Sequence, residues 1–111
     1  MKIINHDNFV ILEDEQNDLE KFASFLEFQI NKKFKGQNVV LDLSQNKELK
    51  LTELLYFLNI SNAHRNTKHS LVIINDAINP DDIPTEMVVV PTLQEAEDII
   101  EMENIERELG F

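Results

Sequence analysis

The side chains that could do metal chemistry are three histidines and a group of aspartates. The histidines are His6, His64 and His69. They are scattered along the sequence, and their spacing does not match a zinc site. Asp76, Asp81 and Asp82 could attract a hard cation, but their spacing does not match an EF-hand loop. The prolines among them are equally typical of a turn. We expect a turn at this segment, and surface positions for the two histidines that lie near one helix end.

Motifs for nucleophilic catalysis and for phosphate binding are missing from the sequence. There is no cysteine, which excludes disulfides, thiolate catalysis and cysteine zinc sites. The two glycines, Gly36 and Gly110, cannot form a Walker loop or a dinucleotide fingerprint. No nucleophile elbow supports a Ser-His-Asp arrangement. The sequence therefore predicts a protein that is not an enzyme and that has no cofactor and no metal.

The charge balance excludes two classes of partner. Twenty-one acidic residues against ten basic ones give a net charge of −11, which repels nucleic acid and anionic membrane surfaces. There is no apolar run of signal-peptide or membrane-spanning length. We expect a cytoplasmic protein with neither nucleic acid nor membrane as a partner. Its 111 residues fit one domain, 1–111.

One hydroxyl stands at a position where function often collects. Residues 39–43 are predicted as a buried strand, and a polar loop leads from this strand to a helix for which Thr52 is the expected N-cap. Loops at the carboxyl ends of strands in α/β domains lie on the same edge as helix N-termini. The sequence thus points to the edge of the sheet around Thr52.

The remaining elements follow from periodicity and from turn and capping residues. The opening segments 2–4 and 9–12 predict a β-hairpin, because the four residues between them are turn formers. Asn17 is the expected cap of a first helix, which ends near Gly36 and leaves Phe25 and Phe28 off its apolar face. The later expected elements are a strand at 71–74, a loop at 75–85, a strand at 87–90, and a helix from the Thr92 cap to about residue 109.

The predicted order is β-β-α-β-α-β-(loop)-β-α. This alternation indicates an α/β fold with a mixed, mostly parallel sheet of four or five strands and helices packed on it. The apolar residues of the last helix change sides along its length, so its second half is expected to leave the sheet. That helix segment, 92–111, contains seven acids and one base. An acidic face beside an apolar row could meet a basic partner, but solvated acidic helices are common, and the solvated helix is the favoured interpretation.

Three segments of the sequence can be compared with known families, namely VVLDLSQNKELKLTELLYFL, LVIIND and VVVPTLQEAEDII. Together they resemble the STAS domain of bacterial anti-sigma-factor antagonists and sulphate-transporter tails. The resemblance covers nearly the whole chain in element order and is sharpest at 39–44 and 92–96. It implies a single-domain STAS-like fold and places Thr52 at the family's phosphorylatable Ser or Thr. This chain has Lys50-Leu51-Thr52-Glu53 where kinase-switched members have an Asp-Ser-Ser-Gly-like run.

The resemblance implies a non-enzymatic regulatory module that docks a protein partner, such as an anti-sigma factor or a kinase-like regulator. The expected docking residues lie around the start of the second helix and are Lys47, Lys50, Thr52, Glu53, Tyr56 and Ile60. A second hypothesis is a homo-oligomer, in the simplest case a homodimer, without a phosphoswitch. It would bury surplus apolar residues between copies, namely Tyr56, Ile60, Met102, Ile105 and Leu109. A third, small-ligand binding at the same edge, has no residue pattern behind it.

Overall fold

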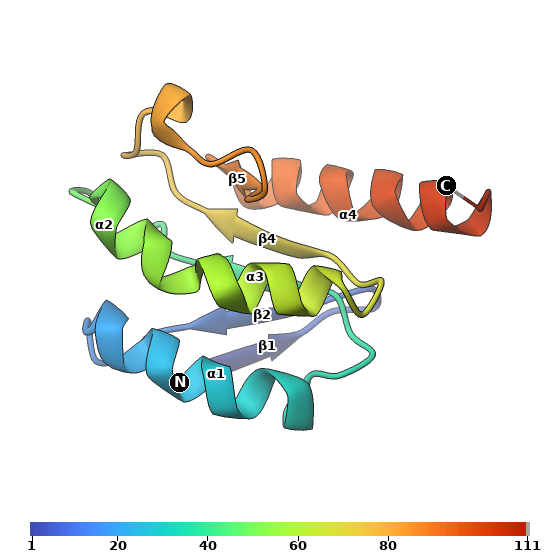
Figure 1. The fold of residues 1–111 in the computed structure, drawn as a ribbon, viewed down its shortest axis with the longest axis horizontal. Helices are drawn as coiled ribbons and strands as arrows, with labels where there is room; N and C mark the ends of the chain where they lie inside the picture. Colours follow the sequence, from blue (N-terminus) through green and yellow to red (C-terminus); the bar gives the residue numbers. More distant parts are fainter. Residues whose placement is uncertain (111) are drawn as a thin grey trace.

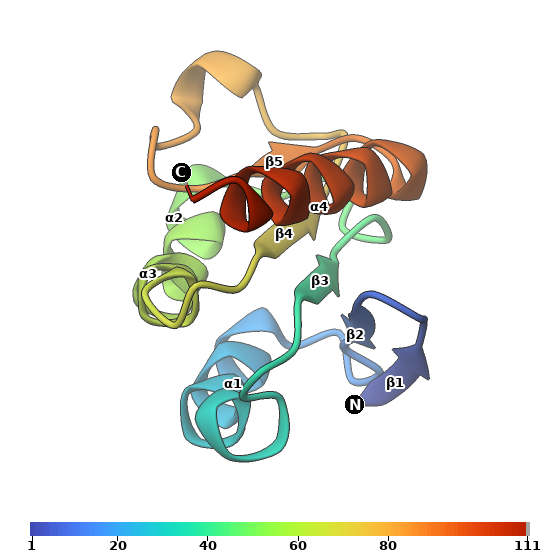
Figure 2. The same ribbon diagram turned by 90° about the vertical axis from the view of Figure 1, so that its right-hand side faces the viewer.

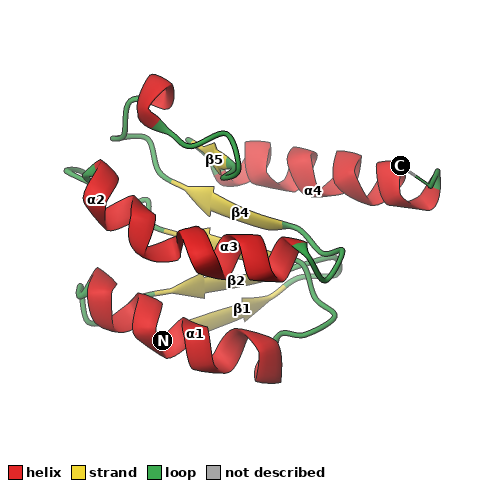
Figure 3. Cartoon of the chain, viewed as in Figure 1, coloured by secondary structure: helices red, strands yellow, loops and turns green. Residues whose placement is uncertain are grey.

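Five strands form one mixed sheet (Figures 1 and 3), and they are hydrogen-bonded side by side in the same order as in the sequence. The computed structural model describes residues 1–110. The strands are β1 (Lys2–Asn5), β2 (Val10–Glu13), β3 (Val39–Asp42), β4 (Leu71–Ile74) and β5 (Val89–Val90). β1 is antiparallel to β2, and the other neighbouring strands are parallel. The predicted hairpin and the mostly parallel sheet are confirmed.

Helices cover both faces of this sheet. They are α1 (Leu19–Lys33), α2 (Leu51–Leu54), the 3₁₀ turn η1 (Leu55–Phe57), α3 (Leu58–Arg65), the 3₁₀ turn η2 (Pro80–Asp82) and α4 (Leu93–Glu108). Alternate strand residues such as Leu41 and Ile73 pack in one core with α1 and α3, while Val40 and Val72 pack in a second core with α4. α4 therefore lies on the opposite face of the sheet from α1 and α3 (Figure 2).

The element order is as predicted, but the cap of α1 is not the expected residue. The carboxylate of Asp18 accepts a hydrogen bond from the Lys21 amide at 3.1 Å and caps the helix. Asn17 has a φ of 52°, in the left-handed region, whereas an N-cap has extended backbone. Asp14 decides this local conformation, because its carboxylate accepts from the Asp18 amide at 2.7 Å.

The last strand is shorter than the predicted 87–90. Met87 donates its amide to the Pro84 carbonyl in a turn, and its side chain is buried in the core shared with α1 and α3. β5 is left with two residues, which pair with Ile73 and Ile74 of β4. The loop before it contains a single helical turn, η2, as expected from its prolines.

α4 is held to the sheet by different residues in its two halves. Ala96 and Ile100 are buried in the first half. In the second half the Glu103 carboxylate accepts from the Ser70 hydroxyl at 2.6 Å and pairs with Arg65 of α3 at 3.1 Å. Arg107 donates to the Ser70 hydroxyl oxygen at 3.1 Å. The second half extends beyond the strands, as predicted (Figure 1), but a polar network anchors it.

Within residues 1–110, no helix combines the length and the apolar character that spanning a bilayer would require.

Candidate docking surface

The loop between β3 and α2 is fixed in place by a buried asparagine. The Asn75 side-chain amide donates to the Leu43 carbonyl at 2.9 Å and to the Asn46 carbonyl at 3.0 Å. Its carbonyl oxygen accepts from the amides of Ala77 and Ile78. Asn75 thus ties this loop to the loop after β4. Sequence reasoning missed Asn75, although an asparagine directly after an all-apolar strand was the available signal.

Thr52 lies at the start of α2 but does not cap it, so the predicted capping role is wrong. Lys50 is the residue before the first helical turn, with extended backbone. The Glu53 carboxylate accepts a hydrogen bond from the Lys50 amide at 3.0 Å. A Thr52 cap would place the first helical residue at Glu53, whereas α2 begins two residues earlier, at Leu51. The earlier start is possible because Glu53, the third helical residue, provides a hydrogen-bond acceptor for the Lys50 amide. Thr52 is the second residue of α2 and is exposed.

The exposed face of α2 and η1 carries three large apolar side chains. Leu51, Leu55 and Tyr56 are each 38 to 40% exposed, while Leu54 and Phe57 are fully buried. The buried residues Leu54, Phe57, Ser61 and His64 recur every three or four residues, so the buried side of this segment runs through Phe57 and leaves Leu51 and Leu55 outside it.

Most of the predicted docking residues surround this face. Lys47, Lys50 and Thr52 are exposed, and Glu53 is partly buried. The Lys47 ammonium lies 3.6 Å from the Asp76 carboxylate, an ion pair between two exposed side chains that contributes little to stability. Ile60 is only 2% exposed and lies in the core, so it cannot belong to a docking surface or to the surplus apolar surface of an oligomer.

A hollow of about 510 Å³ adjoins the start of α2. It is lined by the β3–α2 loop, by Lys50 and Glu53 of the α2 start, and by Asn17 and Leu19 at the start of α1. We call the hollow, the loop residue Lys47, and the exposed residues Lys50, Leu51, Thr52, Leu55 and Tyr56 the α2 rim. The rim joins apolar side chains to two lysines, a combination that suits contact with another protein better than a chemical reaction.

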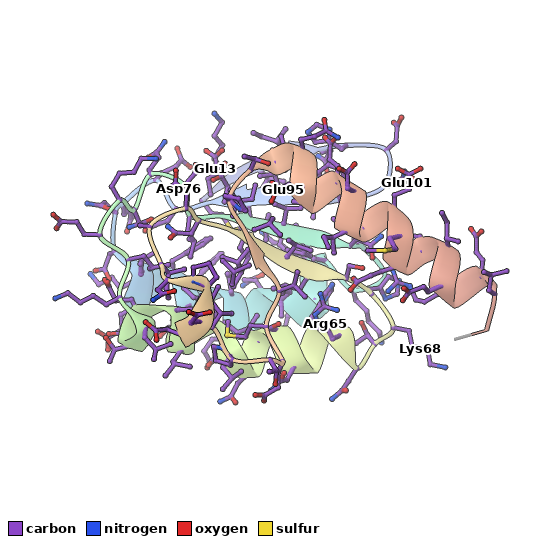
Figure 4. All side chains as sticks on the ribbon, turned by 90° about the horizontal axis from the view of Figure 1, so that it is seen from above. Glu13, Arg65, Lys68, Asp76, Glu95 and Glu101 are labelled. Atoms are coloured by element: carbon purple, nitrogen blue, oxygen red, sulfur yellow. The ribbon has the colours of Figure 1, made fainter. Side chains whose placement is uncertain are left out.

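The remaining candidate groups do not form a chemical centre. Asp76 lies towards one end of the molecule (Figure 4). Asp81 and Asp82 are exposed in η2, and no cluster of three or more histidine, aspartate and glutamate side chains suited to a metal ion occurs in the described part of the chain. The three aspartates are brought together by neither a shared pocket nor a shared hydrogen bond.

His64 is buried, contrary to the expected surface position. Its Nε2 lies 2.7 Å from the Gln37 carbonyl, which fits a neutral ring that donates from Nε2. Burial lowers the pKa of His64 below its usual value of 6.5, and the charges of His69 and Arg65 lower it further. The hydrogen bond to Gln37 opposes this shift. His64 therefore links α3 to the loop before β3 as a neutral side chain.

Comparison with known proteins identifies the fold. No family model and no curated protein matches the sequence. Among solved structures, the chain is similar to one described as "Molecular architecture of the stressosome, a signal integration and transduction hub". The TM-score is 0.61 at 18% identity, and the match covers 96% of this chain and 99% of that chain. This likeness shows the fold alone, which is the STAS-like α/β fold that the sequence resemblance implies.

Proposed function

We propose that this chain is a non-enzymatic regulatory module that docks a protein partner through the α2 rim. The observation that carries the proposal is the exposure of Leu51, Leu55 and Tyr56 on consecutive turns of one short helical segment. Three large apolar side chains grouped at a polar edge are typical of protein interaction surfaces. The structural neighbour belongs to a signal integration and transduction hub, which agrees with a regulatory role in an assembly.

The geometry of the rim favours a rigid docking surface. Asn75 holds the β3–α2 loop by two hydrogen bonds, and Leu49 at the end of this loop is buried in the core. A surface that is ordered before binding loses less conformational entropy on association. Lys47 and Lys50 favour a partner that presents carboxylates beside an apolar contact.

Thr52 is included in the proposal as a phosphorylation site. It is exposed and lies in the first turn of α2. Because Thr52 does not cap the helix, capping does not explain the presence of a hydroxyl at this position. A phosphate there would add nearly two negative charges beside Glu53 and would oppose a partner that presents carboxylates. Phosphorylation would therefore release the partner.

Site-specific photo-crosslinking in the native cell tests the docking surface. A photo-reactive amino acid replaces Leu55 or Tyr56 in turn, and mass spectrometry identifies the adducts. Asn66, exposed at the far end of α3, is the matched control position. We expect the same protein adduct from both rim positions. The adduct should disappear when the crosslinking protein also carries Lys47→Glu and Lys50→Glu. Adducts no stronger than at Asn66 would overturn the proposal.

The intact mass of the protein isolated from its native cell tests phosphorylation. A mass increase of one phosphate that is lost in the Thr52→Ala variant would support the site.

A second candidate function is a homo-oligomeric subunit, and a specific observation on α4 favours it. Met102 and Ile105 are each 50% exposed, and Leu109 is 68% exposed, on a helix that is anchored by its other side. Apolar side chains on a rigid helix invite burial by another molecule. Sedimentation velocity across a concentration series tests this candidate, which a monomer at every concentration would eliminate.

A further inference from the structure

α4 carries an exposed row of residues spaced four, three and four apart. The row is Asp98, Met102, Ile105 and Leu109, and this spacing places all four on one side of a helix. The opposite side of α4 faces the protein through Ala96, Ile100 and Arg107. We call this row the α4 stripe. Within residues 1–110, its three apolar side chains are half-exposed or more.

Acidic residues on either side of the α4 stripe lack cationic partners. Glu101 and Glu108 lie along one edge, and Glu95 and Glu106 lie along the other. Among the acids of α4 within the described residues, only Glu103 forms an ion pair. The single basic residue of this helix, Arg107, is turned towards Asn38 and Ser70. The charges along the stripe therefore repel one another, and a cationic surface would relieve that repulsion.

α1 carries a row with the same spacing and the opposite charge. The row is Lys21, Phe25, Phe28 and Lys32, which we call the α1 stripe. Phe28 is 72% exposed, although phenylalanine is usually buried. A hollow of about 270 Å³ beside Lys21 and Phe25 could receive an apolar side chain. Each stripe runs over twelve residues, so its ends are roughly 16 Å apart along the helix, eleven steps at about 1.5 Å per residue.

The two stripes cannot meet within one molecule. α1 packs on one face of the sheet and α4 on the other, and the two helices lie at opposite edges (Figures 1 and 2). Contact between them requires two copies of the chain. Because the two surfaces differ, the contact is head-to-tail, and it leaves one free α1 stripe and one free α4 stripe for further copies.

We propose that the α4 stripe of one copy packs on the α1 stripe of a second copy of this chain. This inference rests on the second candidate function, homo-oligomerisation, and specifies its interface. Met102, Ile105 and Leu109 cover Phe25 and Phe28. Lys21 and Lys32 meet the acidic edges of α4. A symmetric contact between two α4 stripes would instead oppose acid with acid, without a base on either side.

The net charge of −11 does not prevent this contact. At physiological ionic strength, charges are screened beyond about 8 Å. The residues at the contact therefore decide whether the electrostatic interaction between the two copies is attractive or repulsive. A single pair of helical rows is smaller than a standard stable interface, so we expect weak, reversible association. It will show as a concentration-dependent rise of the sedimentation coefficient between micromolar and near-millimolar protein.

Charge reversal tests the interface on purified full-length protein. We expect Lys21→Glu with Lys32→Glu to abolish the concentration-dependent rise. Met102→Glu with Ile105→Glu should do the same from the other side. Lys47→Glu with Lys50→Glu makes the same charge change as the α1 variant on the α2 rim, and should retain the rise. Circular dichroism checks that each variant is folded, which we expect because all of these positions are exposed or half-exposed.

Mixing the variants distinguishes a head-to-tail contact from any symmetric one. The α1 variant keeps an intact α4 stripe, and the α4 variant keeps an intact α1 stripe. Each alone should be monomeric, whereas an equimolar mixture should form a dimer that grows no further. If the wild-type protein associates and both substituted variants associate equally well, this interface is wrong, although homo-oligomerisation itself is still supported. A wild-type monomer at every concentration would overturn both.

Discussion

The side chain of Asn75 donates a hydrogen bond of 2.9 Å to the carbonyl of Leu43, although the two residues are 32 positions apart. This contact joins the ends of two neighbouring parallel strands, β3 and β4, and fixes the loop that leads to α2. Both polar atoms of the Asn75 side-chain amide have partners, the nitrogen in the β3–α2 loop and the oxygen in the loop after β4. The geometry of the α2 rim therefore depends on a residue outside it.

We expect Asn75→Ala to lower the free energy of unfolding by about 2 to 3 kcal/mol, because it leaves buried carbonyl and amide groups without partners. Urea denaturation measures the change. Asn79→Ala is the matched control in the same loop, since Asn79 is exposed and accepts one hydrogen bond from Asp81. Its effect should be below about 1 kcal/mol. Equal losses in the two variants would contradict the role of Asn75.

The two threonines at helix starts should respond differently to alanine. Thr92 caps α4, with its hydroxyl oxygen 3.2 Å from the Glu95 amide, so Thr92→Ala should cost about 1 kcal/mol of stability. Thr52 does not cap α2, and Thr52→Ala should change stability by less than about 0.5 kcal/mol. Thermal denaturation of both variants, with Thr92→Ser as a control that keeps the hydroxyl, measures the difference. A loss at Thr52 as large as that at Thr92 would restore the predicted cap.

Glu103 should be the acidic residue of α4 on which stability depends. Its carboxylate accepts from Ser70 and pairs with Arg65, and both ends of the pair are largely shielded from solvent. Glu103→Ala should cost about 2 kcal/mol, the range for hydrogen bonds to charged groups. Glu106→Ala removes the same charge from an exposed position and should be neutral or slightly stabilising. Urea denaturation compares them, and similar losses in both would refute the anchoring role.

Stability should fall as the pH drops below about 6.5, because His64 binds a proton more readily in the unfolded chain. Burial lowers the pKa of His64 in the folded protein, so between the lowered pKa and 6.5 the unfolded state takes up the additional proton. The loss is at most about 1.4 kcal/mol per pH unit and stops below the lowered pKa. Urea denaturation at several pH values measures this slope.

His64→Gln should flatten the slope, because glutamine does not titrate and can still donate to the Gln37 carbonyl. The control is His6→Gln, at an exposed histidine that stacks on Phe9. That variant should keep the wild-type pH dependence. If His64→Gln kept it too, another group would be responsible.

Local patterns were sufficient for the order of the elements and for a mostly parallel α/β sheet, and the family resemblance implied the STAS-like fold. The all-apolar strand 71–74 and the Thr92 cap depend on residues that are close in sequence, and both were correctly predicted. The exact start of α2 at Leu51 was not, because two competing local solutions, a Thr52 cap and the Glu53 contact to the Lys50 amide, are both compatible with the sequence. Packing of Leu49 and Leu54 in the core accompanies the second solution.

Burial of single side chains was decided only by the tertiary structure. Periodicity places Leu51, Leu55 and Leu58 on one side of a helix, but the structure buries the side that carries Leu54 and Phe57 and leaves Leu51 and Leu55 exposed. His64 is buried because the loop at Gln37, 27 residues away, covers it. Sequence by itself determined which segments are helix or strand, since these depend on neighbours along the chain. Only the assembled sheet and helices decided which side chains remain free to meet another molecule.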